Sequence, residues 1–236
     1  MKSDRGAAPP KCLVTVDGPA GSGKTTLGRR LAGLLGVPLI DTGLLYRAVT
    51  VAAARAGYGP DDGGRLADLA LRARIEVGTD PSDTAPAIRI DGEDVSASIR
   101  DPGLAPLLAA VSRNPGVRAA LLAPQRRLAP HGEAVAVGRD CGTVVFPGAP
   151  VKLYLDAPAA VREARRARQL SDGSGAVAPA TLTAEVEDRD RSDARRSDAP
   201  MRPAADALLI WTDRVGVEEM VALAAAACRD AGLPVA

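Results

Sequence analysis

The stretch that decides the fold is residues 12–36, CLVTVDGPAGSGKTTLGRRLAGLLG. Its first part, Cys12 to Asp17, is a short apolar run closed by a glycine-rich turn, which is typical of a buried parallel strand. The part from Lys24 to Leu35 places leucines at helical spacing, and Gly36 is a suitable C-terminal stop. The sequence therefore predicts a strand, a loop and a helix in immediate succession.

The loop, residues 18–25, satisfies the phosphate-binding P-loop pattern G-x-x-x-x-G-K-[ST]. Its glycines let backbone N–H groups point at phosphate oxygens, and the helix presents the positive end of its dipole. We expect Lys24 to reach the β- and γ-phosphates and the Thr25 hydroxyl to join the shell of a Mg²⁺ ion that accompanies ATP. The alternative is a chance glycine-rich turn, but the strand before it and the helix after it favour nucleotide binding. The predicted ATP-binding residues are Gly18, Pro19, Ala20, Gly21, Ser22, Gly23, Lys24, Thr25 and Thr26.

Further alternation of strands and helices predicts an α/β protein with a parallel sheet. A second strand at residues 39–41 leads into a helix over about 44–56. Later strands are expected at 134–137, 151–155 and 207–211, and later helices at about 117–128, 159–170, 183–196 and 217–230. Together with the first strand this makes five strands flanked by helices.

Two segments differ in amino-acid composition from this core. Residues 60–113 are rich in Asp, Pro and Gly, with a strand at 88–90 before a hairpin turn, and are predicted to be a small inserted subdomain. Residues 171–179 are small and polar, which is typical of a mobile loop, and we place a lid at about 165–185. The core is then residues 11–59 and 114–236, and residues 1–10 are expected to be a disordered tail.

The composition excludes several classes of protein. Among 236 residues the formal net charge is +1, which gives no general attraction to a nucleic acid polymer or a membrane. The three cysteines, Cys12, Cys141 and Cys228, have no CxxC spacing, so they indicate free thiols in a reducing compartment. No apolar run approaches the ~20 residues of a membrane span. We therefore expect a cytoplasmic protein that works as a monomer.

Three further segments narrow the choice among P-loop proteins. They are DTGLLYR at 41–47, GRDCGTVVFP at 138–147 and RDRSDARR at 189–196. With these segments in this order, the chain resembles the bacterial cytidylate kinases from Leu13 to about Leu223. The resemblance implies a P-loop NTPase-type fold with an acceptor-binding inserted subdomain and a mobile lid. It also implies transfer of the γ-phosphoryl group of MgATP to CMP or dCMP.

The resemblance implies roles for residues outside the P-loop. Residues matching Arg47, Arg139 and Arg196 hold the acceptor phosphate, for which planar guanidinium groups are well suited. Arg118 and Asp140 match residues that read the cytosine edge, and Arg189 and Asp193 match residues that bind the ribose. Asp41 and Thr42 complete the expected substrate-binding set, and Lys24, Arg139, Asp140 and Arg189 are the expected catalytic set. The alternative for residues 189–196 is a solvated helix with internal ion pairs.

The sequence also departs from the pattern of the family. Val137 stands where Glu or Asp is usual, so either the metal site lacks one carboxylate or Val137 is a packing residue. Ala109 stands where some members have a base-reading serine, with Ser112 nearby, and Gly148 replaces a frequent Asp. The basic residues Arg162, Arg165, Arg166 and Arg168 either belong to the lid or form an exposed helix face. These departures leave two alternatives open: a P-loop kinase for another small acceptor such as UMP, AMP or shikimate, and a nucleotide-binding regulatory protein with impaired transfer.

Overall fold

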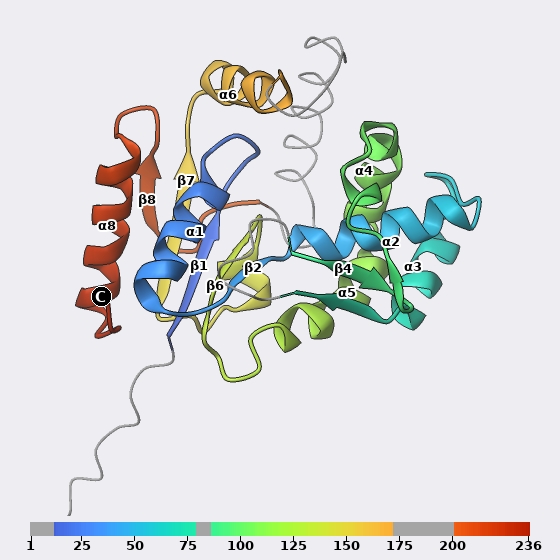
Figure 1. Cartoon of the computed structure of the whole chain (residues 1–236), viewed down its shortest axis with the longest axis horizontal. Coiled ribbons are helices and arrows are strands. Elements are labelled where there is room, and N and C mark those ends of the chain that lie inside the picture. Colours follow the sequence, from blue (N-terminus) through green and yellow to red (C-terminus); the bar gives the residue numbers. More distant parts are fainter. Residues whose placement is uncertain (1–11, 79–85, 172–200) are drawn as a thin grey trace, which may run out of the picture.

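The computed structural model describes residues 12–78, 86–171 and 201–236. Its main sheet has five parallel strands in the spatial order β2-β6-β1-β7-β8 (Figure 1). The bounds are β1 Leu13–Asp17, β2 Leu39–Asp41, β6 Ala134–Gly138, β7 Val151–Asp156 and β8 Leu208–Trp211. The predicted α/β fold with five parallel strands is confirmed, and the strands that carry site segments, β1, β2 and β6, are neighbours.

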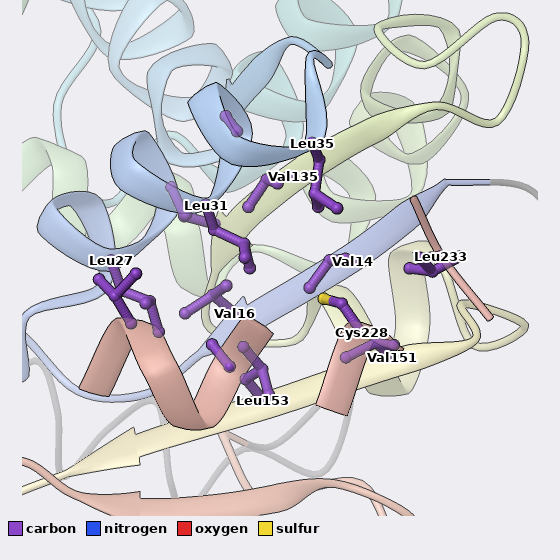
Figure 2. Close-up of a cluster of buried hydrophobic side chains, with 14 of the residues drawn as sticks. Val14, Val16, Leu27, Leu31, Leu35, Val135, Val151, Leu153, Cys228 and Leu233 are labelled. Carbon is purple, nitrogen blue, oxygen red and sulfur yellow. The ribbon is translucent and has the colours of Figure 1, made fainter. Parts of the chain in front are cut away.

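Helices α1, Lys24–Leu35, and α8, Val217–Asp230, cover one face of this sheet (Figure 1). Alternate residues of β1, Val14 and Val16, point into this layer because successive side chains of a strand face opposite sides. Leu27 and Leu31 of α1 pack above them and are fully buried (Figure 2). This cluster fixes the start of α1 over the end of β1.

The opposite face of the sheet is lined by small residues. Ala134 and Ala136 of β6 pack there with Cys141, the first residue of the π-helix η3, Cys141–Val145. Arg126 donates hydrogen bonds to the carbonyl oxygens of Val144 and Val145, at 3.0 and 2.8 Å, and so holds the end of η3. The segment that follows β6 therefore folds back beneath the sheet.

A second group of helices surrounds its own buried cluster. It consists of α2, Gly43–Arg55; α3, Gly63–Arg72; α4, Ala105–Arg113; and α5, Pro115–Arg127, which gather at one side of the main sheet (Figure 1). A three-stranded sheet, β3-β4-β5, packs beside α2 with bounds β3 Ile75–Val77, β4 Ile88–Ile90 and β5 Glu93–Asp94. Short turns η1, Ser98–Arg100, and η2, Pro102–Leu104, lead into α4.

This second group contains structure that the sequence did not predict, namely α3, β3 and α4. The expected strand at 88–90 and its hairpin turn are present, because β4 pairs with β5 across Asp91 and Gly92. The shared cluster runs from Leu45 to Leu121 and so includes α2 and α5, which flank residues 60–113. That residues 60–113 are an independent subdomain stays a prediction. Helix α6, Ala159–Ser171, follows β7 and lies at the P-loop end of the sheet (Figure 1).

Candidate functional site

The loop between β1 and α1 has the geometry of a phosphate cradle. Gly18 has a φ of 141° and lies against the backbone of β7, where an added Cβ would overlap the carbonyl oxygen of Leu155. The Lys24 ammonium group folds back over the loop and donates to the carbonyl oxygen of Pro19 at 2.5 Å. Thr25 and Thr26 are exposed in the first turn of α1. The structure therefore brings the predicted ATP-binding residues, 18–26, into one strand-to-helix turn.

A pocket of about 260 Å³ lies beside the P-loop. Its walls come from the P-loop and α1, from α6, and from the loop and helix after β8. The lining residues are Gly21, Ser22, Gly23, Thr26, Arg165, Arg168, Thr212, Val215, Val217 and Met220. Apolar walls with a few polar groups are typical of a site for a planar organic group such as a nucleobase.

Two arginines of α6 hold this pocket together. Arg165 donates to the hydroxyl and carbonyl oxygens of Thr212, at 2.8 and 2.7 Å, and Arg162 donates to the carbonyl oxygen of Ala20 at 3.1 Å. Arg165 is thus bonded to a wall of the pocket, and Arg162 to the P-loop beside it. Arg168 is exposed at the rim of the pocket, and the side chain of Arg166 lies outside the description.

The residues predicted to bind the acceptor begin where β2 ends. Asp41 accepts the N–H of Gly43 at 2.9 Å, at the start of α2. Burial raises the pKa of Asp41, against the opposing effects of that hydrogen bond and of the charges of Arg47, Lys24 and Arg139. Arg47 donates to the carbonyl oxygen of Ile99 at 2.9 Å, and Arg139 contacts the sulfur of Met201 at 3.1 Å. The structure therefore gathers three predicted cationic residues around one carboxylate, next to the P-loop.

Arg118 and Asp140 form a buried ion pair, with side chains 11% and 6% exposed. Arg118 reaches Asp140 from α5 and also lies over the ring of Tyr46, 5.7 Å from its centroid. The hydroxyl of Ser112 donates to the carbonyl oxygen of Ala109 at 3.2 Å, one turn away on α4. The two residues predicted to read the acceptor base are therefore in direct contact, beside α2 and α4.

Thr42 and Val137 have roles within the protein itself. Thr42 is 3% exposed, and its hydroxyl donates to the carbonyl oxygen of Val137 at 3.1 Å. Val137 is 2% exposed and packs against α1, where a Cβ added to Gly28 would lie 2.6 Å from its Cγ1. The packing alternative for Val137 therefore agrees with its surroundings. That Thr42 binds substrate stays a prediction.

Some predicted site residues lie outside the described residues, which exclude 1–11, 79–85 and 172–200. They are Arg189, Asp193 and Arg196, the helix expected at 183–196, the terminal tail and most of the expected lid. Within the described residues, no group of three or more His, Cys, Asp or Glu side chains is arranged to hold a metal ion. Thr25 is exposed at the end of the P-loop, and its hydroxyl fits a Mg²⁺ ion that arrives with nucleotide phosphates, because Mg²⁺ commonly takes few protein ligands.

Sequence reasoning missed three features of the site. Asp17, 4% exposed, ends β1 and accepts the N–H groups of Cys141 and Gly142, both at 2.7 Å. Lys152 of β7 pairs with Asp206 at 2.8 Å, just before β8. The loop at 212–217 supplies pocket walls with no motif of its own. An acidic residue at the end of a central parallel strand, directly before a P-loop, is the signal that would have identified Asp17.

Comparison with known proteins places this site in a family. The family model described as Cytidylate kinase matches residues 14–230, from β1 to the end of α8. The chain belongs to the cytidylate kinase family. The resemblance that the sequence segments indicated is therefore confirmed. The whole described site lies within the matched residues of this family.

Relatives in the cytidylate kinase family align over nearly the full chain. The chain is 41% identical to a cytidylate kinase of Rhodococcus jostii (strain RHA1), over 89% of this chain and 92% of the relative. It is 42% identical to a cytidylate kinase of Nocardia farcinica (strain IFM 10152), over 89% of this chain and 90% of the relative. Among solved structures, a gluconokinase from Sinorhizobium meliloti 1021 aligns over 95% of this chain and 96% of its own, at 16% identity and a TM-score of 0.47. At that distance it adds nothing to the assignment.

Proposed function

We propose that this protein transfers the γ-phosphoryl group of ATP to CMP or dCMP, giving ADP and CDP or dCDP. The observation that carries the proposal is that P-loop and acceptor residues lie together at one edge of the sheet. Lys24 of the P-loop interacts electrostatically with Asp41, and so do Arg47 and Arg139. The P-loop suits the triphosphate of the donor, and Arg47 and Arg139 suit the phosphate of the acceptor. Their proximity therefore suits phosphoryl transfer between two nucleotides. Membership of the cytidylate kinase family supports cytidine as the acceptor nucleoside.

In the proposed reaction an oxygen of the acceptor phosphate attacks the γ-phosphorus in line. The new P–O bond forms as the bond to the β-phosphate oxygen breaks, and ADP leaves. A phosphate oxygen that is already ionised near pH 7 needs no strong base, so the protein supplies position and positive charge rather than a nucleophile. Lys24 would stabilise charge on the transferring group, and Arg47 and Arg139 would hold the acceptor phosphate.

The donor would lie with its phosphates in the P-loop and its adenine in the pocket between α6 and residues 212–217. A Mg²⁺ ion bound with ATP would be held by the Thr25 hydroxyl and would neutralise phosphate charge. Arg165 would keep the pocket wall in place through Thr212. Arg118 and Asp140 would together present a donor and an acceptor to the cytosine edge, and Tyr46 would support Arg118.

Arg189 and Asp193 are proposed to hold the ribose, Arg196 the acceptor phosphate, and residues of the lid to close over both substrates. Closure excludes water and so favours transfer to CMP over hydrolysis of ATP. We further propose that the protein works in the cytoplasm as a monomer, in which a single chain carries both substrate sites. Cys12, Cys141 and Cys228 are free and buried, which agrees with a reducing compartment. No helix among the described residues is long and apolar enough to cross a membrane.

An acceptor screen tests this proposal. ADP formation is measured with MgATP and CMP, dCMP, UMP, AMP, shikimate or no acceptor, and the product is identified by ³¹P NMR. The expected result is fast turnover with CMP or dCMP, and turnover at least about 100-fold slower with Lys24→Ala. Turnover with UMP, AMP or shikimate but not with CMP or dCMP would contradict the proposed acceptor and identify another one. Nucleotide binding without transfer to any acceptor would favour the regulatory alternative.

A further inference from the structure

Asp17 is a buried carboxylate that the proposed reaction does not use. It is the last residue of β1, directly before Gly18, and is 4% exposed. A buried carboxylate is unfavourable unless hydrogen bonds or charges compensate for its lost hydration. Its presence at the junction of a strand and the P-loop therefore needs a structural reason.

The reason lies in its two hydrogen bonds to a distant segment. Oδ1 accepts the N–H of Cys141 and Oδ2 accepts the N–H of Gly142, each at 2.7 Å. These are the N–H groups of the first two residues of η3. Asp17 thus joins the start of the P-loop to the start of η3 through a two-pronged, charge-assisted contact.

The neighbouring residues are arranged for this contact. Gly142 lies so close that an added Cβ would be 2.8 Å from the Thr15 hydroxyl and 3.3 Å from Oδ2 of Asp17. The far end of η3 is held separately, by the hydrogen bonds from Arg126. The two ends of η3 are therefore fastened by different residues, and Asp17 fastens the end that follows directly on Asp140.

We propose that Asp17 is a positioning residue for acceptor recognition: by fixing the N–H groups of Cys141 and Gly142, it sets the place of Asp140 and, through it, of Arg118. This inference rests on the proposed function. Asp17 acts through Asp140 without touching either substrate, and it belongs to the acceptor side although it is next to the donor loop in sequence. Asp140 in turn forms the buried ion pair with Arg118.

Asp17→Asn tests this role, because the amide keeps the shape but offers one accepting oxygen in place of two. Its –NH₂ group then faces an N–H donor of η3. We expect KM for CMP to rise about tenfold, because small displacements of positioning groups have large effects. KM for ATP should change less than about threefold, since the P-loop contacts are untouched. Calorimetry with CMP alone should show the same loss of affinity.

Asp101→Asn is the matched control. Asp101 also accepts a backbone N–H, that of Gly103 at 2.8 Å, but it is exposed and lies at η2. This variant should leave both KM values unchanged. Equal rises of both KM values in Asp17→Asn would show that Asp17 supports the P-loop, and unchanged values would show that its contact is inert. Either outcome would overturn the proposal.

Gly142→Ala provides an independent measurement should Asp17→Asn fail to fold. The added methyl group pushes the start of η3 away from Asp17 while the carboxylate remains. We expect a selective loss of CMP affinity here as well, and a variant with normal CMP affinity would contradict the proposal. If the wild-type protein does not phosphorylate CMP at all, the proposed function fails. If it does and both variants retain normal CMP affinity, the inference about Asp17 fails by itself.

Discussion

The buried pair of Arg118 and Asp140 offers a quantitative test of how the acceptor side is built. The change is a double-mutant cycle with Arg118→Met, Asp140→Ala and the two combined. With the side chains 11% and 6% exposed, removing one partner leaves the other charge buried and unpaired. That situation typically costs about 3–5 kcal/mol, whereas a surface pair is worth about 0–1 kcal/mol. The double variant leaves neither charge buried without a partner, so it should be more stable than the less stable single variant.

The free energy of unfolding is measured by urea denaturation followed by circular dichroism. For a protein of this size, 3–5 kcal/mol corresponds to a fall in Tm of roughly 6–20 °C. Single variants that each cost less than about 1 kcal/mol and add without coupling would refute the description of a buried, mutually dependent pair.

Four further predictions follow from contacts in the site. Lys24→Ala should lower kcat at least about 100-fold with Tm nearly unchanged, since Lys24 faces the transferred charge; near-normal turnover would contradict the P-loop assignment. Burial raises the pKa of Asp17 to about 6 from its ordinary 3.8. Between pH 3.8 and pH 6 the folded state therefore holds a proton on Asp17 that the unfolded state has lost, and the free energy of unfolding falls as the pH rises through this range. Relative to Asp17→Asn, the wild-type free energy of unfolding should therefore decrease by about 2 kcal/mol from pH 4 to pH 7 in urea titrations, and a pH-independent difference would contradict the raised pKa of Asp17. Val137→Glu should lower Tm because Val137 is 2% exposed against α1, and an unchanged Tm with a lower Mg²⁺ requirement for half-maximal rate would favour the metal alternative instead. Arg165→Gln should raise KM for ATP but not for CMP, since Arg165 bonds Thr212 in the donor pocket; a change confined to CMP would place Arg165 elsewhere.

The sequence was sufficient for features that depend on local pattern. The apolar run of β1, the glycine-rich loop and the leucine spacing of α1 are adjacent in the chain, so strand, cradle and helix follow from one stretch of residues. The later strands were predicted for the same reason. The ends of these elements agree with the structure to within one or two residues, which is the usual ambiguity of helix and strand ends.

Features that depend on distant contacts escaped the sequence. Asp17 bonds a segment more than a hundred residues away, and although its place before the P-loop could have singled it out, no spacing in the sequence indicates this partner. Helices α3 and α4 lie in a stretch with helix-breaking Pro and Gly, where packing in the second cluster outweighs local preference. The backbone partners of Arg162 and Arg165 also escaped the sequence, because an arginine-rich helix has no sequence signature for the carbonyl oxygens it bonds.

The two large hydrophobic clusters have a mechanical consequence. The cluster beneath α1 and α8 and the cluster among α2–α5 have no residue in common. Leu128, at the end of α5, packs against both the second cluster and the small-residue layer under the sheet. The second cluster therefore meets the packing under the sheet at Leu128, while Arg118 and Arg126 join α5 to the segment after β6 through polar contacts. Leu128→Ala would loosen the apolar part of this junction and leave the residues of both large clusters in place.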